Sequence, residues 1–295
     1  MIEVVGLTKR FDKAKALADL NMFVKKGSIY GLVGANGAGK TTALKHIAGI
    51  LKADSGMVKI DGQDVYENIK IKETVCFIPD ELRFPGSSPK DSARLYSQLY
   101  KEWDWDAYKS LMADFSLNEK QKATRLSKGM QKQAAFALAL AAKPDCLLLD
   151  EPIDGLDPLA RKLVLKRIVE NVAEREMTVL VSSHNLRDME GLCDSIGILS
   201  KGSMRIERDL DELMSDLHKV QVAFHEQTPL ENRYLDLDVL HSEKRGAVEV
   251  LIIRCPKERM DAVIGRLSPV LYDALPLSLE EIFIYEIGGG ANALA

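Results

Sequence analysis

The chain has 295 residues, of which 46% are hydrophobic and 28% are charged, a balance that excludes disordered and fibrous proteins. At about 150 residues per domain, this length predicts two domains. The 44 acidic residues outnumber the 40 Lys and Arg, and a net charge of −4 argues against a protein built mainly to bind nucleic acid. No apolar stretch approaches the roughly 18–20 residues of a membrane helix, and the first five residues do not resemble a signal peptide. We therefore expect no segment that crosses a membrane unaided.

The four cysteines and five histidines show no spacing typical of metal sites. The sequence contains neither a Cys-x-x-Cys pair nor a His-Glu-x-x-His pattern, so a structural zinc site is not expected. Cysteines of this kind are typical of buried thiols in a reducing cytoplasm. The residues concerned are Cys76, Cys146, Cys193 and Cys255.

Short apolar runs alternate with helical patterns through the first 205 residues or so. Fully apolar strands separated by helices are typical of a parallel sheet covered on both faces, so an α/β fold is predicted. Two helical patterns in the middle of this region indicate a helical insert. The predicted elements, in chain order, are a strand at 28–33, a helix at 40–51, a helical segment at 91–117, a helix at 128–142, and strands at 146–149, 178–181 and 196–199.

The composition changes near residue 215. Residues 216–295 contain 8 basic and 13 acidic residues, a net charge of −5, which leaves +1 for residues 1–215. The second region is long enough for a small α+β domain. Its predicted elements are strands at 219–224 and 248–254, a helix at 258–267, and a helix that begins with a capping box at Ser278 and Glu281, before a glycine-rich tail at 288–290.

A phosphate-binding loop is predicted between the strand at 28–33 and the helix that follows. Its sequence fits the pattern G-x-x-x-x-G-K-[S/T], in which glycine N–H groups and a helix N-terminus surround a phosphate. Lys40 is expected to reach the β- and γ-phosphates, and the Thr41 hydroxyl to bind Mg²⁺. The alternative is a glycine turn with a chance lysine. The predicted ATP-binding residues of the loop are Gly34, Ala35, Asn36, Gly37, Ala38, Gly39, Lys40, Thr41 and Thr42.

Two carboxylates, Asp150 and Glu151, follow the apolar strand at 146–149. Ligands of parallel α/β sheets bind at the carboxyl ends of strands. We expect Asp150 to hold Mg²⁺ and Glu151 to take a proton from the attacking water. An ordinary acidic turn after a strand is the alternative when this motif is considered alone.

Together these residues resemble the ATPase subunit of ATP-binding cassette (ABC) transporters over about residues 1–205. The run Leu126-Ser127-Lys128-Gly129-Met130 is similar to the family's signature motif L-S-G-G-Q. The resemblance implies that Ser127, Lys128, Gly129 and Met130 contact the γ-phosphate held by a second copy. Two ATP molecules would then lie within a head-to-tail dimer. Ser127 also fits a plain helix N-cap, and both roles are compatible.

Three further segments carry the resemblance. Residues 154–157 resemble the D-loop, which implies that Asp157 lies near the dimer seam. Ser182-Ser183-His184 resembles the H-loop, which implies that His184 contacts the γ-phosphate and holds Glu151 and the water in line. Phe11 occupies the position of an aromatic residue that stacks on adenine, with a core phenylalanine as the alternative.

The sequence departs from the family pattern at two places. The signature has Lys128 and Met130 where the family has Gly and Gln. Residues 77–80 read Phe-Ile-Pro-Asp, where the family usually ends in Gln. Asp80 is shorter and carries charge, and we hypothesise that it joins the Mg²⁺ shell when the dimer closes.

The resemblance implies a P-loop NTPase fold of the ABC ATPase type. Its nucleotide-binding domain spans 1–215, with a helical subdomain at about 82–142, and a small C-terminal accessory or regulatory domain spans 216–295. The implied function is hydrolysis of ATP with Mg²⁺ by a homodimer that drives a separate transmembrane permease, on the cytoplasmic face of the cell membrane. The segment 276–284 resembles the ending of subunits that serve drug, antibiotic or polysaccharide exporters.

Two functions other than transport are also compatible with a phosphate-binding loop. One is a soluble ABC ATPase that acts in DNA repair, chromosome maintenance or translation without a permease. Its relatives usually carry coiled coils, zinc modules or two cassettes, and this chain has one phosphate loop, no heptad array and no Cys pair. The other is a P-loop kinase or GTPase, which the signature and H-loop positions disfavour.

Overall fold

The computed structural model describes residues 2–210, 212, 217–225 and 234–286. The chain divides into two compact units, residues 1–207 and 208–295. This division precedes the domain boundary expected at residue 215. Among the described residues, no helix combines the length and the apolar character needed to span a membrane.

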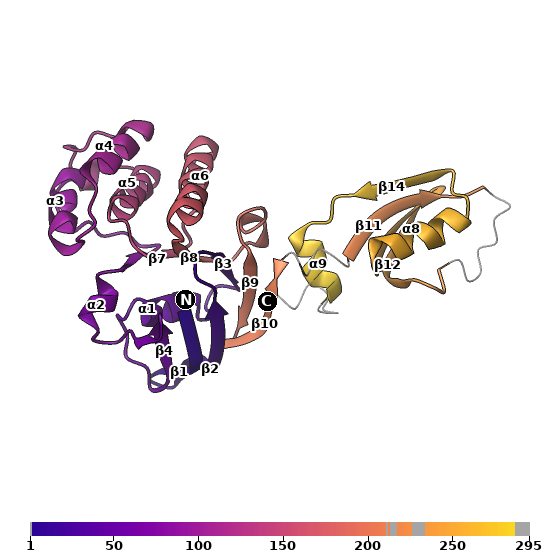
Figure 1. Ribbon diagram of the computed structural model, residues 1–295, viewed down its shortest axis with the longest axis horizontal. Helices are drawn as coiled ribbons and strands as arrows, with labels where there is room; N and C mark the ends of the chain where they lie inside the picture. Colours follow the sequence, from indigo (N-terminus) through magenta and orange to yellow (C-terminus); the bar gives the residue numbers. More distant parts are fainter. Residues whose placement is uncertain (1, 211, 213–216, 226–233, 287–295) are drawn as a thin grey trace. The chain divides into compact units, whose positions relative to one another are not determined.

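A six-stranded sheet forms the centre of the first unit (Figure 1). In spatial order its strands are β10 (Ser203–Asp209), β9 (Ser195–Ser200), β3 (Ile29–Val33), β8 (Thr178–Ser183), β7 (Cys146–Asp150) and β6 (Val75–Ile78). β3 runs parallel to β8 and β9, and β7 runs parallel to β6 and β8. Every residue of β3, β7 and β8 is buried, which explains their largely continuous apolar sequences. The predicted parallel sheet is confirmed.

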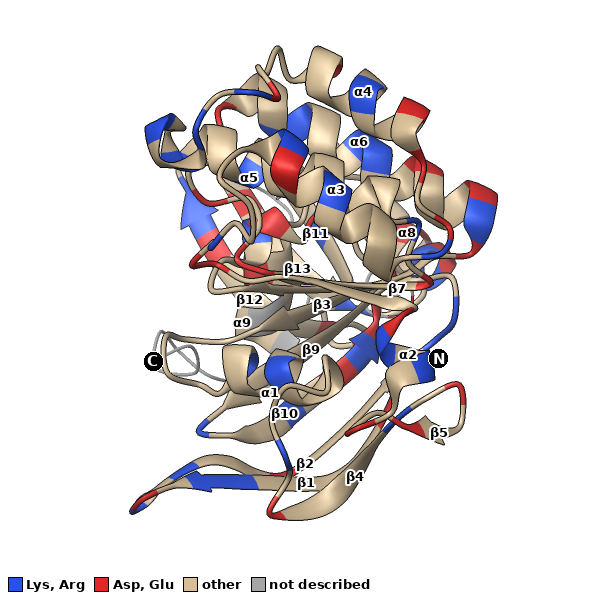
Figure 2. Cartoon of the chain, turned by 90° about the vertical axis from the view of Figure 1, so that its left-hand side faces the viewer, with Lys and Arg blue, Asp and Glu red and all other residues tan. Residues whose placement is uncertain are grey.

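A second, antiparallel sheet lies on the other side of helix α1 (Lys40–Ile47), as Figure 2 shows. Its strands, in spatial order, are β2 (Ala14–Val24), β1 (Ile2–Phe11), β4 (Ser55–Ile60) and β5 (Gln63–Asp64). Leu44 and Ile47 of α1 share one buried cluster with Leu148 of β7 and Val4 of β1. The sequence analysis missed this sheet, because register shifts in both pairings of β1 interrupt the alternation of buried and exposed positions.

Helices cover the opposite face of the six-stranded sheet (Figure 2). Helix α5 (Lys128–Ala141) contacts β6, the neighbouring helix α6 (Pro158–Arg175), and the pair α3 (Pro89–Leu99) and α4 (Trp105–Asp114). The helical pattern predicted over 91–117 is therefore confirmed, and the structure divides it into the two helices α3 and α4. Tyr100 has extended backbone (φ −103°, ψ 117°) that ends α3, and Asp104 caps α4 by accepting the N–H groups of Asp106 and Ala107. The described residues of the first unit also form the short helices α2 (Ile69–Lys72), η1 (Ala123–Arg125) and η2 (Leu186–Asp188).

The described residues of the second unit form an antiparallel sheet together with helices α8 and α9 (Figure 1). Its strands, in spatial order, are β12 (Asp238–Arg245), β13 (Val248–Arg254), β11 (Leu217–Ala223) and β14 (Leu271–Leu275). In the chain, helix α8 (Lys257–Arg266) lies between β13 and β14, and helix α9 (Leu279–Glu286) follows β14. Met260 and Ile264 of α8 pack with Val220 and Leu251 of the sheet. Ser278 and Glu281 form the predicted capping box, with reciprocal bonds of 3.1 and 3.3 Å. The glycine-rich tail at 288–290 lies outside the described residues.

Three of the four cysteines are buried, and Cys193 is partly exposed. Burial in the apolar sheet raises the pKa of both Cys76 and Cys146 to about 12, so neither thiol ionises near neutral pH. The prediction of buried thiols therefore holds for Cys76, Cys146 and Cys255 and is only partly correct for Cys193.

Candidate functional site

The predicted phosphate loop connects the end of β3 to the start of α1. Gly39 has a φ of 110°, and a Cβ at this position would lie 2.6 Å from the carbonyl oxygen of Ala16, so the fold requires glycine here. Lys40 opens α1 and is only 6% exposed. Its ammonium group donates to the carbonyl oxygens of Gly34 and Ala35, at 2.6 and 3.3 Å. The loop thus holds a buried cation beside a helix N-terminus, a combination that favours anions.

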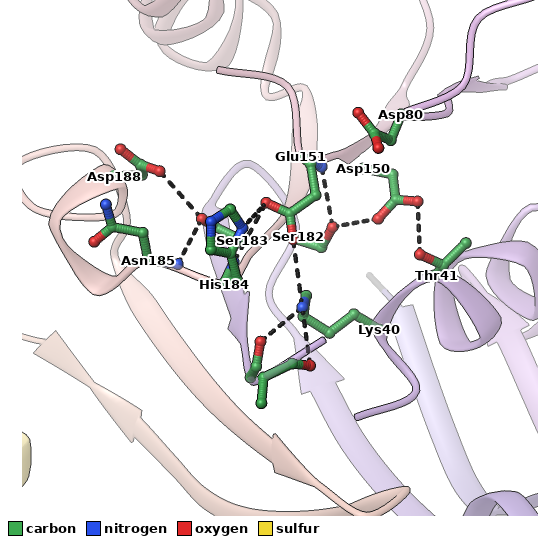
Figure 3. Close-up of polar contacts among 12 residues, drawn as sticks. Lys40, Thr41, Asp80, Asp150, Glu151, Ser182, Ser183, His184, Asn185 and Asp188 are labelled. Atoms are coloured by element: carbon green, nitrogen blue, oxygen red, sulfur yellow. Dashed lines mark hydrogen bonds and ion pairs between the residues drawn. The ribbon is translucent and has the colours of Figure 1, made fainter. Parts of the chain in front are cut away.

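Asp150, at the end of β7, receives hydrogen bonds from two hydroxyl groups (Figure 3). Thr41 on α1 donates to its Oδ2 at 2.8 Å, and Ser182 on β8 donates to its Oδ1 at 2.6 Å. The carboxylate is 2% exposed, and the two hydroxyls fix its orientation. The arrangement joins the phosphate loop, which follows β3, to the acidic end of β7, two strands away in the sheet.

Glu151 is held by contacts on every side (Figure 3). Its Oε1 lies 3.3 Å from Lys40 Nζ, and its Oε2 lies 2.9 Å from His184 Nδ1. The N–H group of Glu151 donates to Ser182 Oγ at 3.2 Å. The backbone φ of Glu151 is 46°, in the left-handed region that residues other than glycine rarely adopt. Such conformations persist where surrounding contacts impose them, and they cluster at functional sites.

The Asp80 carboxylate contacts a cation from the helical insert. Lys132 of α5 donates to Asp80 Oδ1 at 3.2 Å and to the carbonyl oxygen of Glu151 at 2.6 Å. The Lys132 side chain is 1% exposed, whereas that of Asp80 is 41% exposed. A buried ammonium therefore links Asp80, two residues after β6, to Glu151, the residue after β7.

These elements surround a cleft of about 250 Å³. Its walls combine the glycine-rich loop and its lysine with three carboxylates, so it offers both an anion site and oxygen ligands for a cation. The lining residues are Ala16, Asn36, Gly37, Ala38, Gly39, Lys40, Thr41, Thr42, Asp80, Asp150 and Glu151. The structure thus gathers most of the predicted loop with three of the four predicted acids, all but Asp157, and His184 joins them through its bond to Glu151.

The donor set in this cleft fits Mg²⁺. This ion prefers oxygen ligands and is usually held by one or two carboxylates together with the phosphates of its substrate. The Thr41 hydroxyl and the Asp150 carboxylate lie within 2.8 Å of each other beside the phosphate loop. Both groups are hard oxygen donors, and they are two of the three residues, with Asp80, that the sequence predicted as metal ligands.

Phe11 does not line the cleft described above. It ends β1, is 46% exposed, and has the Lys9 ammonium 5.6 Å from its ring centroid. A side chain this exposed is not part of a core, so the core alternative for Phe11 is wrong. Stacking on adenine stays a prediction.

The signature residues also lie outside this cleft. Ser127 is the N-cap of α5, and its hydroxyl accepts the N–H group of Met130 at 3.2 Å. A Cβ on Gly129 would lie 2.8 Å from the carbonyl oxygen of Gly155, so the signature backbone touches the predicted D-loop in the same chain. Asp157 caps α6 by accepting the N–H groups of residues 159 and 160, each at 3.0 Å.

Sequence reasoning missed two residues of this site. Ser182 lies in the run Ser182-Ser183-His184, but the sequence alone predicted no role for it. The available signal was its position, because Ser182 places a hydroxyl at the end of an apolar strand, beside the strand that ends in Asp150. Lys132 is a lysine on the turn before the apolar run of α5, and its burial could not be read from the sequence, because lysine is usually exposed.

Comparisons with known proteins give one consistent family. Residues 17–154 match the family described as ABC transporter. The chain is 35% identical to the ABC transporter ATP-binding protein YtrB of Bacillus subtilis, over 98% of this chain and 99% of that protein. It is 29% identical to the bacitracin transport ATP-binding protein BcrA of Bacillus licheniformis, over 98% of each. A solved ATP-binding subunit of an ABC transporter is 29% identical, with a TM-score of 0.66, and the match covers 72% of this chain and 91% of that one.

Proposed function

Because this chain belongs to the ABC transporter family as an ATP-binding and ATP-hydrolysing subunit, we propose that it powers an exporter of antibiotic-like compounds through a separate membrane permease. Lys40, Asp150 and Glu151 converge in one cleft, and this observation carries the part of the proposal that concerns ATP hydrolysis. Export is supported by the similarity along 98% of the chain to a bacitracin transport protein. The segment 276–284, which resembles the ending of exporter subunits, supports the same assignment.

We propose that the cleft binds the triphosphate of ATP. Lys40 would exchange its bonds with the carbonyl oxygens of Gly34 and Ala35 for bonds with β- and γ-phosphate oxygens. Mg²⁺, when bound with ATP, supplies positive charge that offsets the charge of the phosphates. Thr41 and Asp150 would hold this ion, and Asp80 is proposed as a further ligand. The backbone from residue 34 to residue 42 would surround the phosphates, and Phe11 is proposed to stack on the adenine.

Glu151 is the proposed general base. Its Oε2 accepts a bond from His184 Nδ1, and its Oε1 faces Lys40, so the carboxylate is fixed beside the phosphate-binding cation. A general base must lie within hydrogen-bond reach of the proton that it removes. His184, whose imidazole is 44% exposed, would hold Glu151 and contact the γ-phosphate.

We propose that two copies form a head-to-tail dimer around two ATP molecules. The signature residues of this chain do not line its own phosphate cleft, so the site would be completed by Ser127, Lys128, Gly129 and Met130 of a second copy. The start of α5 suits this role, because a hydroxyl and the N-terminus of a 14-residue helix favour an anion. Asp157 is proposed to lie near the dimer seam.

The remaining regions have proposed partners or roles. The segment after Asp80, with the helical subdomain at about 82–142, is proposed to bind the permease and to transmit movement to it. This would place the chain on the cytoplasmic face of the cell membrane. The region 216–295, whose sheet and α8 share an apolar core, is proposed as an accessory or regulatory domain. A chain that ends after residue 215 is therefore expected to keep ATP hydrolysis.

The test combines hydrolysis with association. The purified full chain should release phosphate from ATP in the presence of Mg²⁺, and it should co-purify with membranes only when a permease encoded beside it is co-expressed. Co-purification without a permease would contradict the proposed partner. A soluble role in DNA repair or translation is not favoured, since the relatives reported above are transporter subunits over nearly the whole chain.

A further inference from the structure

Lys132 is a buried cation whose partners lie at two different strand ends. Its Nζ is 3.2 Å from Asp80 Oδ1 and 2.6 Å from the carbonyl oxygen of Glu151. The side chain is 1% exposed on a helix whose following residues, 134–141, are all buried and apolar. Lysine is rarely buried to this degree, because desolvation of an ammonium group is costly unless charge and hydrogen bonds compensate it. Its two oxygen partners supply this compensation.

The contact to Glu151 is made to the main chain and not to the carboxylate. The carbonyl oxygen of Glu151 accepts from Lys132, while its N–H group donates to Ser182 Oγ on β8. These bonds hold both sides of a residue whose φ is 46°. Because that conformation is unfavourable for a glutamate, the residue needs such contacts to stay in it. Loss of the Lys132 bond would let the peptide after Glu151 rotate and move the carboxylate away from His184.

The same lysine sits close to the start of its helix. Ser127 caps α5, and Lys132 lies on the second turn of that helix. A helix of 14 residues moves as a rigid element, so a shift of its N-terminus would reach Lys132 directly. The bonds of Lys132 would pass this shift to Asp80 and to the Glu151 backbone.

We infer that Lys132 is a positioning residue for hydrolysis, which holds the Glu151 backbone in its catalytic conformation and links it to the signature end of α5. This inference rests on the proposed role of Glu151 as general base. Lys132 contacts neither the phosphate loop nor ATP in this scheme, and it acts through the two groups that it bonds, the Glu151 main chain and the Asp80 carboxylate. Its removal should therefore lower kcat and leave the KM for ATP unchanged, because ground-state binding of ATP is not altered.

The experiment uses the full chain and removes the buried charge of Lys132 together with the opposite charge of its partner Asp80. Asp80→Asn is the reference background, and Lys132→Met is added to it, because the double variant lacks both the buried ammonium and its carboxylate partner and so leaves neither charge unpaired. On this background, Lys132→Met should lower kcat by about tenfold or more and change the KM for ATP by less than about twofold. Lys120→Gln removes an exposed charge from the same insert, and it should leave both constants unchanged.

Two outcomes decide the inference. If the double variant melts cooperatively and its kcat stays within about twofold of Asp80→Asn, Lys132 is only a structural counter-ion and the inference is overturned. The inference would also be overturned if the KM for ATP of the double variant rose by the same factor by which its kcat fell, because Lys132 would then act on ATP binding. The Glu151→Gln variant separates the two proposals. If it hydrolyses ATP at the wild-type rate, the proposed base is wrong, whereas a slow Glu151→Gln with a fast double variant rejects Lys132 alone.

Discussion

Ser182 Oγ lies 2.6 Å from Asp150 Oδ1 and donates a hydrogen bond to it. The same oxygen accepts the N–H group of Glu151 at 3.2 Å. One buried hydroxyl on β8 therefore orients both acids at the end of β7, the proposed metal ligand and the proposed base. Residues that hydrogen-bond to metal ligands orient them, and their mutation often reduces metal affinity or activity substantially.

Removal of this hydroxyl should impair hydrolysis. In Ser182→Ala, Asp150 loses one of its two hydroxyl donors, and the N–H group of Glu151 keeps only the Ser182 carbonyl oxygen as acceptor, so kcat should fall by about tenfold. Ser183→Ala is the matched control, because Ser183 is also buried but bonds to Asp188 and Asn185 in the following loop. Steady-state ATPase rates of the two variants provide the measurement. Equal losses in both would mean that general destabilisation explains the effect, contrary to the orienting role.

The neutral variant Glu151→Gln should bind ATP and hydrolyse it poorly. Glutamine keeps the size of the side chain but cannot accept a proton from water, and loss of a general base typically costs about 10²–10⁴-fold in rate. The blocked chain should accumulate as a dimer in size-exclusion chromatography with ATP and Mg²⁺. A profile that stays monomeric while hydrolysis persists would show that the base is another residue.

The local sequence was sufficient to predict the parts of the site that lie on continuous motifs. The loop around Lys40 and the pair Asp150–Glu151 were predictable, because each lies where an apolar strand ends and ligand groups are expected. Lys132 was not, since its partners are 52 and 19 residues away in the chain and no local pattern links them. The strands β1 and β2 were missed for a related reason, because their pairing includes irregular register.

The role proposed for Asp80 predicts a change in Mg²⁺ dependence. If Asp80 joins the Mg²⁺ shell on dimer closure, Asp80→Ala should need a higher Mg²⁺ concentration for half-maximal ATPase activity. Asp80→Asn is the control, because its amide oxygen is still able to bind the ion and to accept a bond from Lys132. A titration with Mg²⁺ at fixed ATP distinguishes the variants. An Asp80→Ala curve that superimposes on the wild-type curve would eliminate Asp80 as a ligand.

Asp104 should contribute stability that depends on pH. The N–H group of Ala107 and the Lys143 ammonium, 2.8 Å away, hold the pKa of this carboxyl below its ordinary value. Since the pKa is lowered in the folded protein, the contribution is complete above the unfolded value of about 3.9 and is lost as pH falls through the folded value. At neutral pH, Asp104→Ala should cost about 1 kcal/mol as a lost helix N-cap.

Urea unfolding of the full chain at several pH values measures this contribution. The gap in unfolding free energy between wild type and Asp104→Ala should be widest near neutral pH and should narrow as the solution is acidified below about pH 4. Asp106→Ala is the control, because Asp106 lies two residues away with a side chain that is 98% exposed. Its stability should stay within about 0.5 kcal/mol of wild type throughout. If the gap for Asp104→Ala were constant down to the lowest pH, the charge of Asp104 would play no part in capping α4.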